Sequence, residues 1–68
     1  MIEHILKGEF IELIKVLKYS GIAGTGGEAK MMVEAGEVML NDQIEHRKRA
    51  KIRRGDKIEL RGEVIKVI

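Results

Sequence analysis

The chain has 68 residues, 44% of them hydrophobic, and a formal net charge of +2, so it has room for one domain over residues 1–68. It contains no cysteine, which excludes disulfides and thiolate metal sites and is typical of a reducing compartment. No stretch approaches the roughly 20 apolar residues of a membrane span, and we therefore expect a soluble, cytoplasmic protein.

The first third of the chain changes from a strand pattern to a helix pattern. "MIEHIL" alternates apolar and polar residues, which predicts a short strand, and Lys7-Gly8 closes it. From Glu9 the apolar residues recur at helical spacing. We therefore expect a first helix that begins near Glu9 and ends at Gly21, a residue free to take positive φ. Its apolar face contains Phe10, Leu13, Ile14 and Leu17.

A second helix is predicted after the glycine-rich stretch "GIAGTGGEAK". Thr25 is a candidate N-cap, Glu28 follows three residues later, and Gly36 stops the helix. The glycines do not match the G-x-x-x-x-G-K-[ST] phosphate loop. They also follow a helix, where a dinucleotide fold needs a strand. We expect this stretch to be a flexible connection between two helices.

The remaining chain predicts strands joined by turns. "EVML" and "QIEH" flank the turn at 41–42, "KIEL" follows the turn at 55–56, and "EVIKVI" follows the turn at 61–62. The sum is an α+β domain, in which two short packed helices in a helix–turn–helix cover a small, mostly antiparallel sheet with a C-terminal hairpin. We expect one core that contains Leu13, Ile14, Leu17, Met32, Val33, Val38, Leu40, Ile52 and Ile58.

Positive charge is concentrated in one short segment. Seven of the 13 Lys and Arg residues fall within residues 47–57. Residues 1–46 hold four Lys and eight acids (net −4), and residues 47–68 hold nine basic residues and three acids (net +6), which together give +2. This asymmetry favours a polyanionic partner. A merely solvated surface is the alternative for any run of charges.

The basic segment has an order of its own if residues 47–54 are extended. Side chains alternate between two faces along a strand, so Ala50 and Ile52 would turn toward the core. The odd-numbered cations would then share one outer face. They are Arg47, Arg49, Lys51 and Arg53.

The residues that carry chemistry elsewhere are scarce. No Ser, Thr or Tyr hydroxyl stands beside a histidine as an activated nucleophile would. His46 follows Glu45 and could form half of a metal site, but two histidines without cysteine favour a surface histidine. We expect no enzyme, no cofactor and no metal.

Residues 10–60 carry an ordered series of motifs. After Leu13 and Leu17 come "GIA" at 21–23, "EAK" at 28–30, "GEVMLN" at 36–41 and "GDKI" at 55–58. This order resembles the S-four RNA-binding domain, a family named after a small-subunit ribosomal protein. The short chain with "RKRAKI" is similar to its stand-alone bacterial members. The resemblance implies an alpha-L motif and a partner that is structured RNA of the ribosomal or transfer class, free or in a ribonucleoprotein such as the ribosome.

The resemblance also implies which residues contact RNA. Lys30 falls where the second helix of the family usually bears Arg or Lys, and the basic segment matches that of the stand-alone members. Glu12 and Gly26 stand where the family usually has Arg, and Asp42 replaces the usual Gly of its turn. With fewer cations on the helices, we expect residues 47–57 to supply the charge. The expected RNA-binding residues are Lys30, Arg47, Lys48, Arg49, Lys51, Arg53 and Arg54, with Lys15, Lys18 and Lys57 as additional contacts.

The scarcity of aromatic residues bears on the mode of RNA recognition. Phe10 and Tyr19 are the only aromatic residues of the Phe, Tyr and Trp class, so we expect binding by shape and backbone phosphates, with little base stacking. The alternative from another class is a protein-interaction module that docks an acidic partner in a ribosome-associated assembly.

Overall fold

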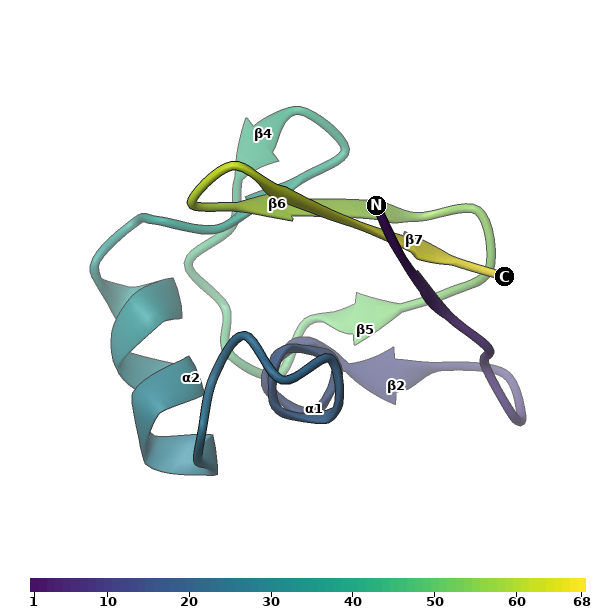
Figure 1. Cartoon of the computed structure of the whole chain (residues 1–68), viewed down its shortest axis with the longest axis horizontal. Coiled ribbons are helices and arrows are strands. Elements are labelled where there is room, and N and C mark those ends of the chain that lie inside the picture. The colour runs from purple at the N-terminus through teal and green to yellow at the C-terminus, as the bar shows by residue number, and fades with distance from the viewer.

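The computed structural model describes all 68 residues and shows two helices on one side of a five-stranded sheet (Figure 1). The helices are α1 (Leu13–Tyr19) and α2 (Gly26–Glu34). The strands are β1 (Ile2–His4), β2 (Ile11–Glu12), β3 (Met39–Leu40), β4 (Gln43–Ile44), β5 (Lys51–Ile52), β6 (Lys57–Leu60) and β7 (Glu63–Val67). The sheet order is β1-β7-β6-β3-β4, with β1 parallel to β7 and the other pairs antiparallel. The predicted α+β class and C-terminal hairpin are confirmed.

Helix α1 begins later than the sequence predicts. Ile11 and Glu12 form β2, which pairs antiparallel with β5 as a separate two-stranded sheet. The helix therefore starts at Leu13 and not near Glu9. Backbone pairing with a distant segment overrides the helical spacing of the apolar residues at this point, and the side chain of Phe10 is left 43% exposed.

Helix α2 begins as predicted. The Thr25 hydroxyl accepts a hydrogen bond from the Glu28 N–H at 3.1 Å, and the Glu28 carboxylate accepts one from the Gly24 N–H at 3.3 Å. Both groups satisfy backbone donors near the helix N-terminus, in the manner of a capping box. The glycine-rich stretch is therefore a helix–helix connection, as predicted, with the Glu28 carboxylate at the helix start.

The two predicted hairpin turns are confirmed by their backbone angles. Asn41 and Asp42 have φ of 50° and 70°, and Arg61 and Gly62 have φ of 49° and 79°. Two successive residues with positive φ are the pattern of a type I′ turn, whose twist suits a two-residue hairpin loop. Asp42 thus occupies a position where glycine would be less strained.

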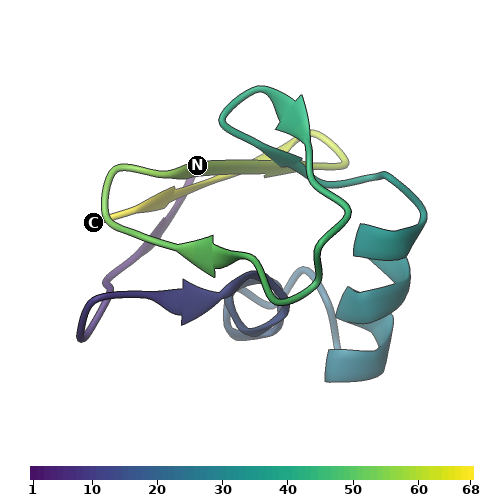
Figure 2. The ribbon, with the colours of Figure 1, turned by 180° about the vertical axis from the view of Figure 1, so that it is seen from behind.

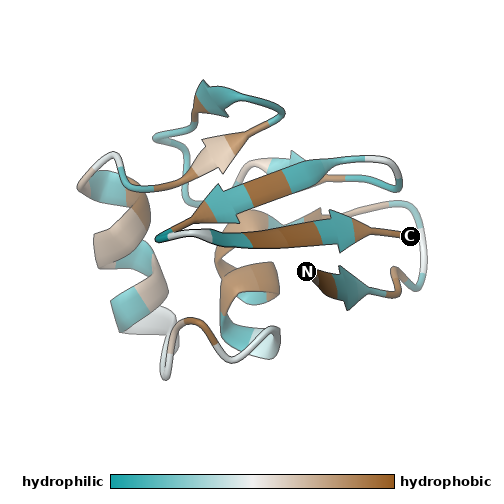
Figure 3. Cartoon of the chain, turned by 45° about the horizontal axis from the view of Figure 1, so that its top comes forward, coloured by the Kyte–Doolittle hydropathy of each residue, from teal (hydrophilic) through white to brown (hydrophobic).

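A single apolar core joins the helices to the sheet. It contains 15 buried residues and no buried polar or charged side chain. Seven of the nine residues predicted for the core are buried, and the other two, Ile14 and Leu40, are half-buried against it. Figure 3 shows the alternation of hydrophilic and hydrophobic residues along β6. The longer helix has nine residues, and no helix has the length and apolarity of a membrane span.

The prediction that residues 47–54 are extended is wrong for the first half of that segment. The Ala50 N–H donates to the Arg47 carbonyl at 3.1 Å, which closes a turn, and only Lys51–Ile52 pair as a strand. The carbonyls of Lys48 and Ala50 then accept hydrogen bonds from Ile14 and Leu13 at the start of α1, at 3.2 and 3.0 Å.

The turn has a physical reason. The first N–H groups of a helix lack partners within the helix, and the residue before α1 makes no capping hydrogen bond with its side chain. Two carbonyls of the basic segment take that role. Ala50 and Ile52 still point into the core, as predicted, with 4% and 0% exposure.

Candidate nucleic-acid interface

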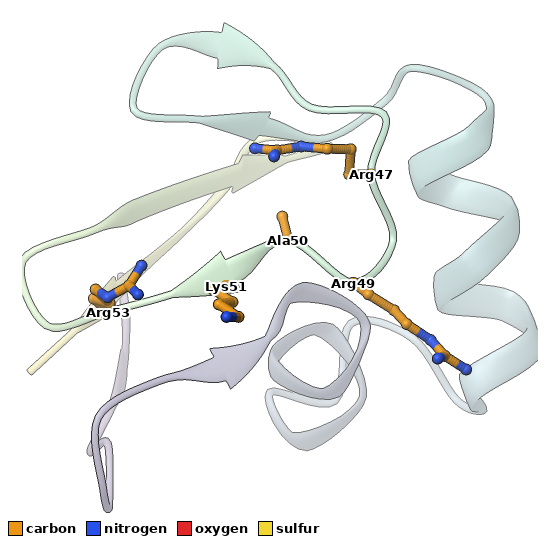
Figure 4. A pocket seen from close by; sticks show the side chains of 5 residues that line it. All are labelled: Arg47, Arg49, Ala50, Lys51 and Arg53. Carbon is orange, nitrogen blue, oxygen red and sulfur yellow. The ribbon is translucent and has the colours of Figure 1, made fainter.

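Four cations of the basic segment surround one open hollow. It has a volume of about 490 Å³ and is lined by Arg47, Arg49, Ala50, Lys51 and Arg53. We call it the basic hollow. The segment that carries these residues runs on the side of the molecule that faces the viewer in Figure 2, and their side chains are drawn in Figure 4. The four odd-numbered cations therefore gather around one site, although the backbone that carries them turns.

Arg47 is held at the rim of the basic hollow by Glu45. Its Nε and Nη2 each donate to a different oxygen of the Glu45 carboxylate at 3.0 Å. These hydrogen bonds lower the pKa of Glu45 and raise that of Arg47. The Glu45 side chain is only 14% exposed and that of Arg47 is 78% exposed. The guanidinium is thus positioned by a half-buried glutamate while its outer surface faces water.

The other three cations of the basic hollow have no carboxylate partner among the ion pairs of the protein. The Lys51 ammonium lies 4.9 Å from the centre of the Phe10 ring, a cation–π contact. The Arg53 backbone N–H donates to the Asp56 carboxylate at 2.7 Å, which fixes the chain but leaves the guanidinium unpaired. Figure 4 shows Arg49, Lys51 and Arg53 leaving the ribbon in different directions. Their charge is available to an anion.

Two cations of the same segment have other partners. The Arg54 guanidinium donates to the carbonyls of Gly8 and Leu6 at 2.9 and 2.7 Å, which ties the loop after β1 to the turn before β6. The Lys57 ammonium lies 2.9 Å from Asp42 and 3.3 Å from Glu59. The hydrogen bond to Asp42 is the main cause of a raised Lys57 pKa. Neither residue lines the basic hollow.

Lys48 and the helix cations do not line the basic hollow. Lys48 is half-buried in the turn, whereas Lys15, Lys18 and Lys30 are exposed on the helices. Lys15 lies 3.9 Å from Glu12.

The flank of α2 that carries Lys30 can be assigned from its neighbours. Residues two apart in a helix lie on nearly opposite sides, so Lys30 and Glu28 flank the buried stripe that contains Ala29. The pKa of Arg61 is raised mainly by its hydrogen bonds to Glu37 and in smaller part by the charge of Glu28. Arg61 belongs to the β6–β7 turn, which is nearest the viewer in Figure 1. Lys30 therefore lies on the flank of α2 opposite Glu28.

The structure groups no metal-binding side chains at this face. No set of three His, Cys, Asp or Glu side chains lies close enough together to hold a metal ion. His46 lies beside Gly36, where a Cβ would stand 3.4 Å from the imidazole Cε1, and Glu45 is engaged by Arg47. What the arrangement offers chemically is a set of donors for phosphate oxygens.

The chain is similar to known proteins over most of its length. The S4 domain family matches residues 4–68. YbcJ of Escherichia coli (strain K12) is 32% identical over 62 residues, which cover 91% of this chain and 89% of YbcJ. The "Probable ribosome maturation protein RlbA" of Bacillus subtilis (strain 168) is 35% identical over 54 residues, 79% of this chain and 76% of RlbA.

The similarity extends to three dimensions. The solution structure of E. coli YbcJ superimposes with a TM-score of 0.78 at 32% sequence identity. The match covers 100% of this chain and 87% of that one. That structure is described as revealing an alfaL motif involved in RNA-binding.

Proposed function

This chain belongs to the S4 domain family, and from that membership we propose that it is a non-catalytic RNA-binding module whose residues 1–68 act as one unit. The RNA is structured and of the ribosomal or transfer class, and it is met in the cytoplasm, free or within a ribonucleoprotein. The related YbcJ structure, described as having a motif involved in RNA-binding, supports the RNA partner. The relative named for ribosome maturation favours the ribosomal class.

The observation that carries the proposal is the basic hollow. Four cations surround it, no carboxylate lines it, and three of the four have no carboxylate partner. Successive phosphates of an RNA backbone would each meet one of these donors, and charge-assisted hydrogen bonds from guanidinium groups to phosphate are the stronger class. Such contacts fix affinity and orientation without reading bases. The interface therefore consists of Arg47, Arg49, Lys51 and Arg53, with Lys30, Lys48, Lys15 and Lys18 on its periphery.

The turn that forms the basic hollow is held by the protein core. Ala50 is buried, and its carbonyl together with that of Lys48 accepts from the first turn of α1. The cations therefore project from a backbone that is fixed before RNA arrives. A fixed site loses less conformational entropy on binding than a mobile loop.

Filter binding of a transfer RNA preparation and of a ribosomal RNA hairpin fragment, repeated at several salt concentrations, tests the proposal. Three to six phosphate contacts predict a slope of log K against log salt of about −2 to −5. Absence of binding to either RNA at low salt would overturn the proposal. An acidic polypeptide added as competitor is expected to displace RNA weakly; if it binds more tightly than both RNAs, the acidic-protein alternative replaces this proposal.

A further inference from the structure

The single Phe and the single Tyr of the protein, Phe10 and Tyr19, line a second hollow. The phosphate contacts proposed above do not involve it. It has a volume of about 410 Å³, and we call it the aromatic hollow. Phe10 is 43% exposed and Tyr19 is 63% exposed. The rings of Tyr19 and His4 are stacked, with centroids 6.3 Å apart and planes 11° apart. The lining residues are His4, Ile5, Leu6, Lys7, Phe10, Ile11, Lys15 and Tyr19.

Exposed apolar side chains converge at this place. Ile5 is 70% exposed and joins Phe10 and Tyr19, so three of the seven large exposed hydrophobic residues of the protein line one hollow. Single exposed apolar residues need no explanation, whereas a contiguous group marks an interaction site. The core is complete without them, because 15 other residues form it.

The polar part of the aromatic hollow is cationic. Lys7 and Lys15 line it, and no carboxylate does. Aromatic faces beside cations match the chemistry of a nucleotide, whose base stacks on a ring while its phosphate meets an ammonium group. Tyr19 stands at the end of α1, so its ring is carried by a fixed element.

One contact joins the aromatic hollow to the basic hollow. Lys51 lines the basic hollow, Phe10 lines the aromatic one, and the Lys51 ammonium lies over the Phe10 ring. The β2–β5 pair, in which Glu12 stands opposite Lys51, joins the two places. An RNA backbone bound at the basic hollow can therefore continue past Lys51 and bring its next nucleotides to Tyr19.

We propose that the aromatic hollow binds an unpaired nucleobase of the same RNA, which stacks on Tyr19 while Lys7 and Lys15 meet the flanking phosphates. This inference rests on the proposed RNA-binding function and adds a contact to single-stranded nucleotides next to the structured part. An apolar peptide would also suit exposed rings. The Lys51–Phe10 contact, next to cations that have no carboxylate partner, favours the polyanion.

Two RNA probes separate this contact from the binding of structured RNA. One is a hairpin with a blunt stem, and the other is the same hairpin with a four-nucleotide single-stranded 3′ extension that carries 2-aminopurine. We expect the protein to bind the extended probe roughly 5- to 150-fold more tightly, the range that alanine substitution gives for one stacked base. We also expect the 2-aminopurine fluorescence to be quenched on binding.

Variants of Tyr19 test whether its ring causes the tighter binding of the extended probe. Tyr19→Ala should abolish the preference for the extended probe and the quenching, and leave the affinity for the blunt hairpin unchanged. Tyr19→Leu, which keeps an apolar side chain without a ring, should behave like Tyr19→Ala, and Tyr19→Phe should keep the preference. Met31→Ala is the matched control, because Met31 is an apolar residue of α2 that lies outside both hollows and is 70% exposed, against 63% for Tyr19.

The outcomes are distinct for the two proposals. If neither probe binds, the RNA-binding function fails together with this inference. If both probes bind equally, or if Tyr19→Ala and Tyr19→Leu retain the preference while circular dichroism confirms folding, the function stands and the nucleobase site does not exist.

Discussion

Arg49 and Arg54 are the same residue type in the same basic segment, and their surroundings assign them different tasks. Arg49 lines the basic hollow and has no protein partner. The Arg54 guanidinium donates hydrogen bonds to two carbonyls of the loop after β1. Sequence alone treats them alike, because the carbonyls that Arg54 contacts lie 46 and 48 residues away along the chain.

We expect substitution by glutamine to affect mainly stability at Arg54 and mainly RNA binding at Arg49. Arg54→Gln should lower the free energy of unfolding by about 1 kcal/mol, because hydrogen bonds from a charged donor are lost, and should change RNA affinity little. Arg49→Gln should leave stability within about 0.5 kcal/mol and make the salt slope of binding shallower by about one. Urea melts measure the stability of both variants, and filter binding measures their RNA affinity. Equal losses of affinity would place Arg54 in the interface.

At the scale of elements, local signals predict most of the fold. The Thr25 cap, the glycine that ends α2 and the two hairpin turns rest on neighbours in sequence, and all are confirmed. The start of α1 and the turn at 48–49 could not be predicted in this way. Both arise from one tertiary contact, in which β2 pairs with β5 and the basic segment supplies acceptors to α1.

The same contact explains what was missed at the site. The helical spacing assigned Phe10 to the buried face of α1, but β2 ends that face at Leu13. Phe10 is left at the surface under Lys51. In the sequence, Phe10 stands three residues before Leu13, which is the spacing of a core position on a helix. Without knowledge of β2, that spacing cannot be told from a buried position.

The helix phase of α1 predicts a sharp contrast between neighbours. Leu17 is fully buried and Lys18 is exposed. Leu17→Ala should cost about 2 to 5 kcal/mol, because a cavity replaces a buried side chain, and Lys18→Ala should be nearly neutral. A cost of this size would unfold a large share of a domain this small. Denaturant melts in which the two variants lose the same stability would contradict the assigned phase.

At the scale of the whole molecule, ion pairs balance the uneven charge along the sequence. Glu37 pairs with Arg61, Asp42 with Lys57, and Glu45 with Arg47. Each of these acids belongs to the acidic first 46 residues and each cation to the basic remainder. The charge that is left over concentrates at the basic hollow and at the helix lysines.

These pairs predict how stability depends on pH. The hydrogen bonds from Arg61, Lys57 and Arg47 lower the pKa of Glu37, Asp42 and Glu45 below their ordinary values of 4.5, 3.8 and 4.5. The folded state therefore binds fewer protons than the unfolded state in this range. The stabilisation is fully present above about pH 5 and is lost as the pH falls through the lowered pKa values.

Urea melts between pH 7 and pH 2.5 measure this effect. The native sequence should lose stability as the pH falls below about 4.5, and the triple variant Glu37→Gln, Asp42→Asn, Glu45→Gln should show a flatter profile because the three linked carboxyls are gone. A triple variant with the same acid-induced loss would assign the pH dependence to other groups.

The central claim is that the cations of the basic hollow bind RNA phosphates. Its most direct test is filter binding of one structured RNA, at several salt concentrations, to Arg49→Glu, to the double variant Arg49→Glu with Lys51→Glu, and to Lys66→Glu. Lys66 is an exposed residue of β7 outside the basic hollow, and its reversal changes the net charge by as much as that of Arg49.

We expect the affinity to fall steeply for Arg49→Glu and further for the double variant, with the salt slope shallower by about one for each lost contact. Lys66→Glu should retain most of the affinity and the full slope. If the double variant is folded by circular dichroism and binds like the native sequence, or if Lys66→Glu loses as much affinity as Arg49→Glu, the basic hollow is not the RNA site.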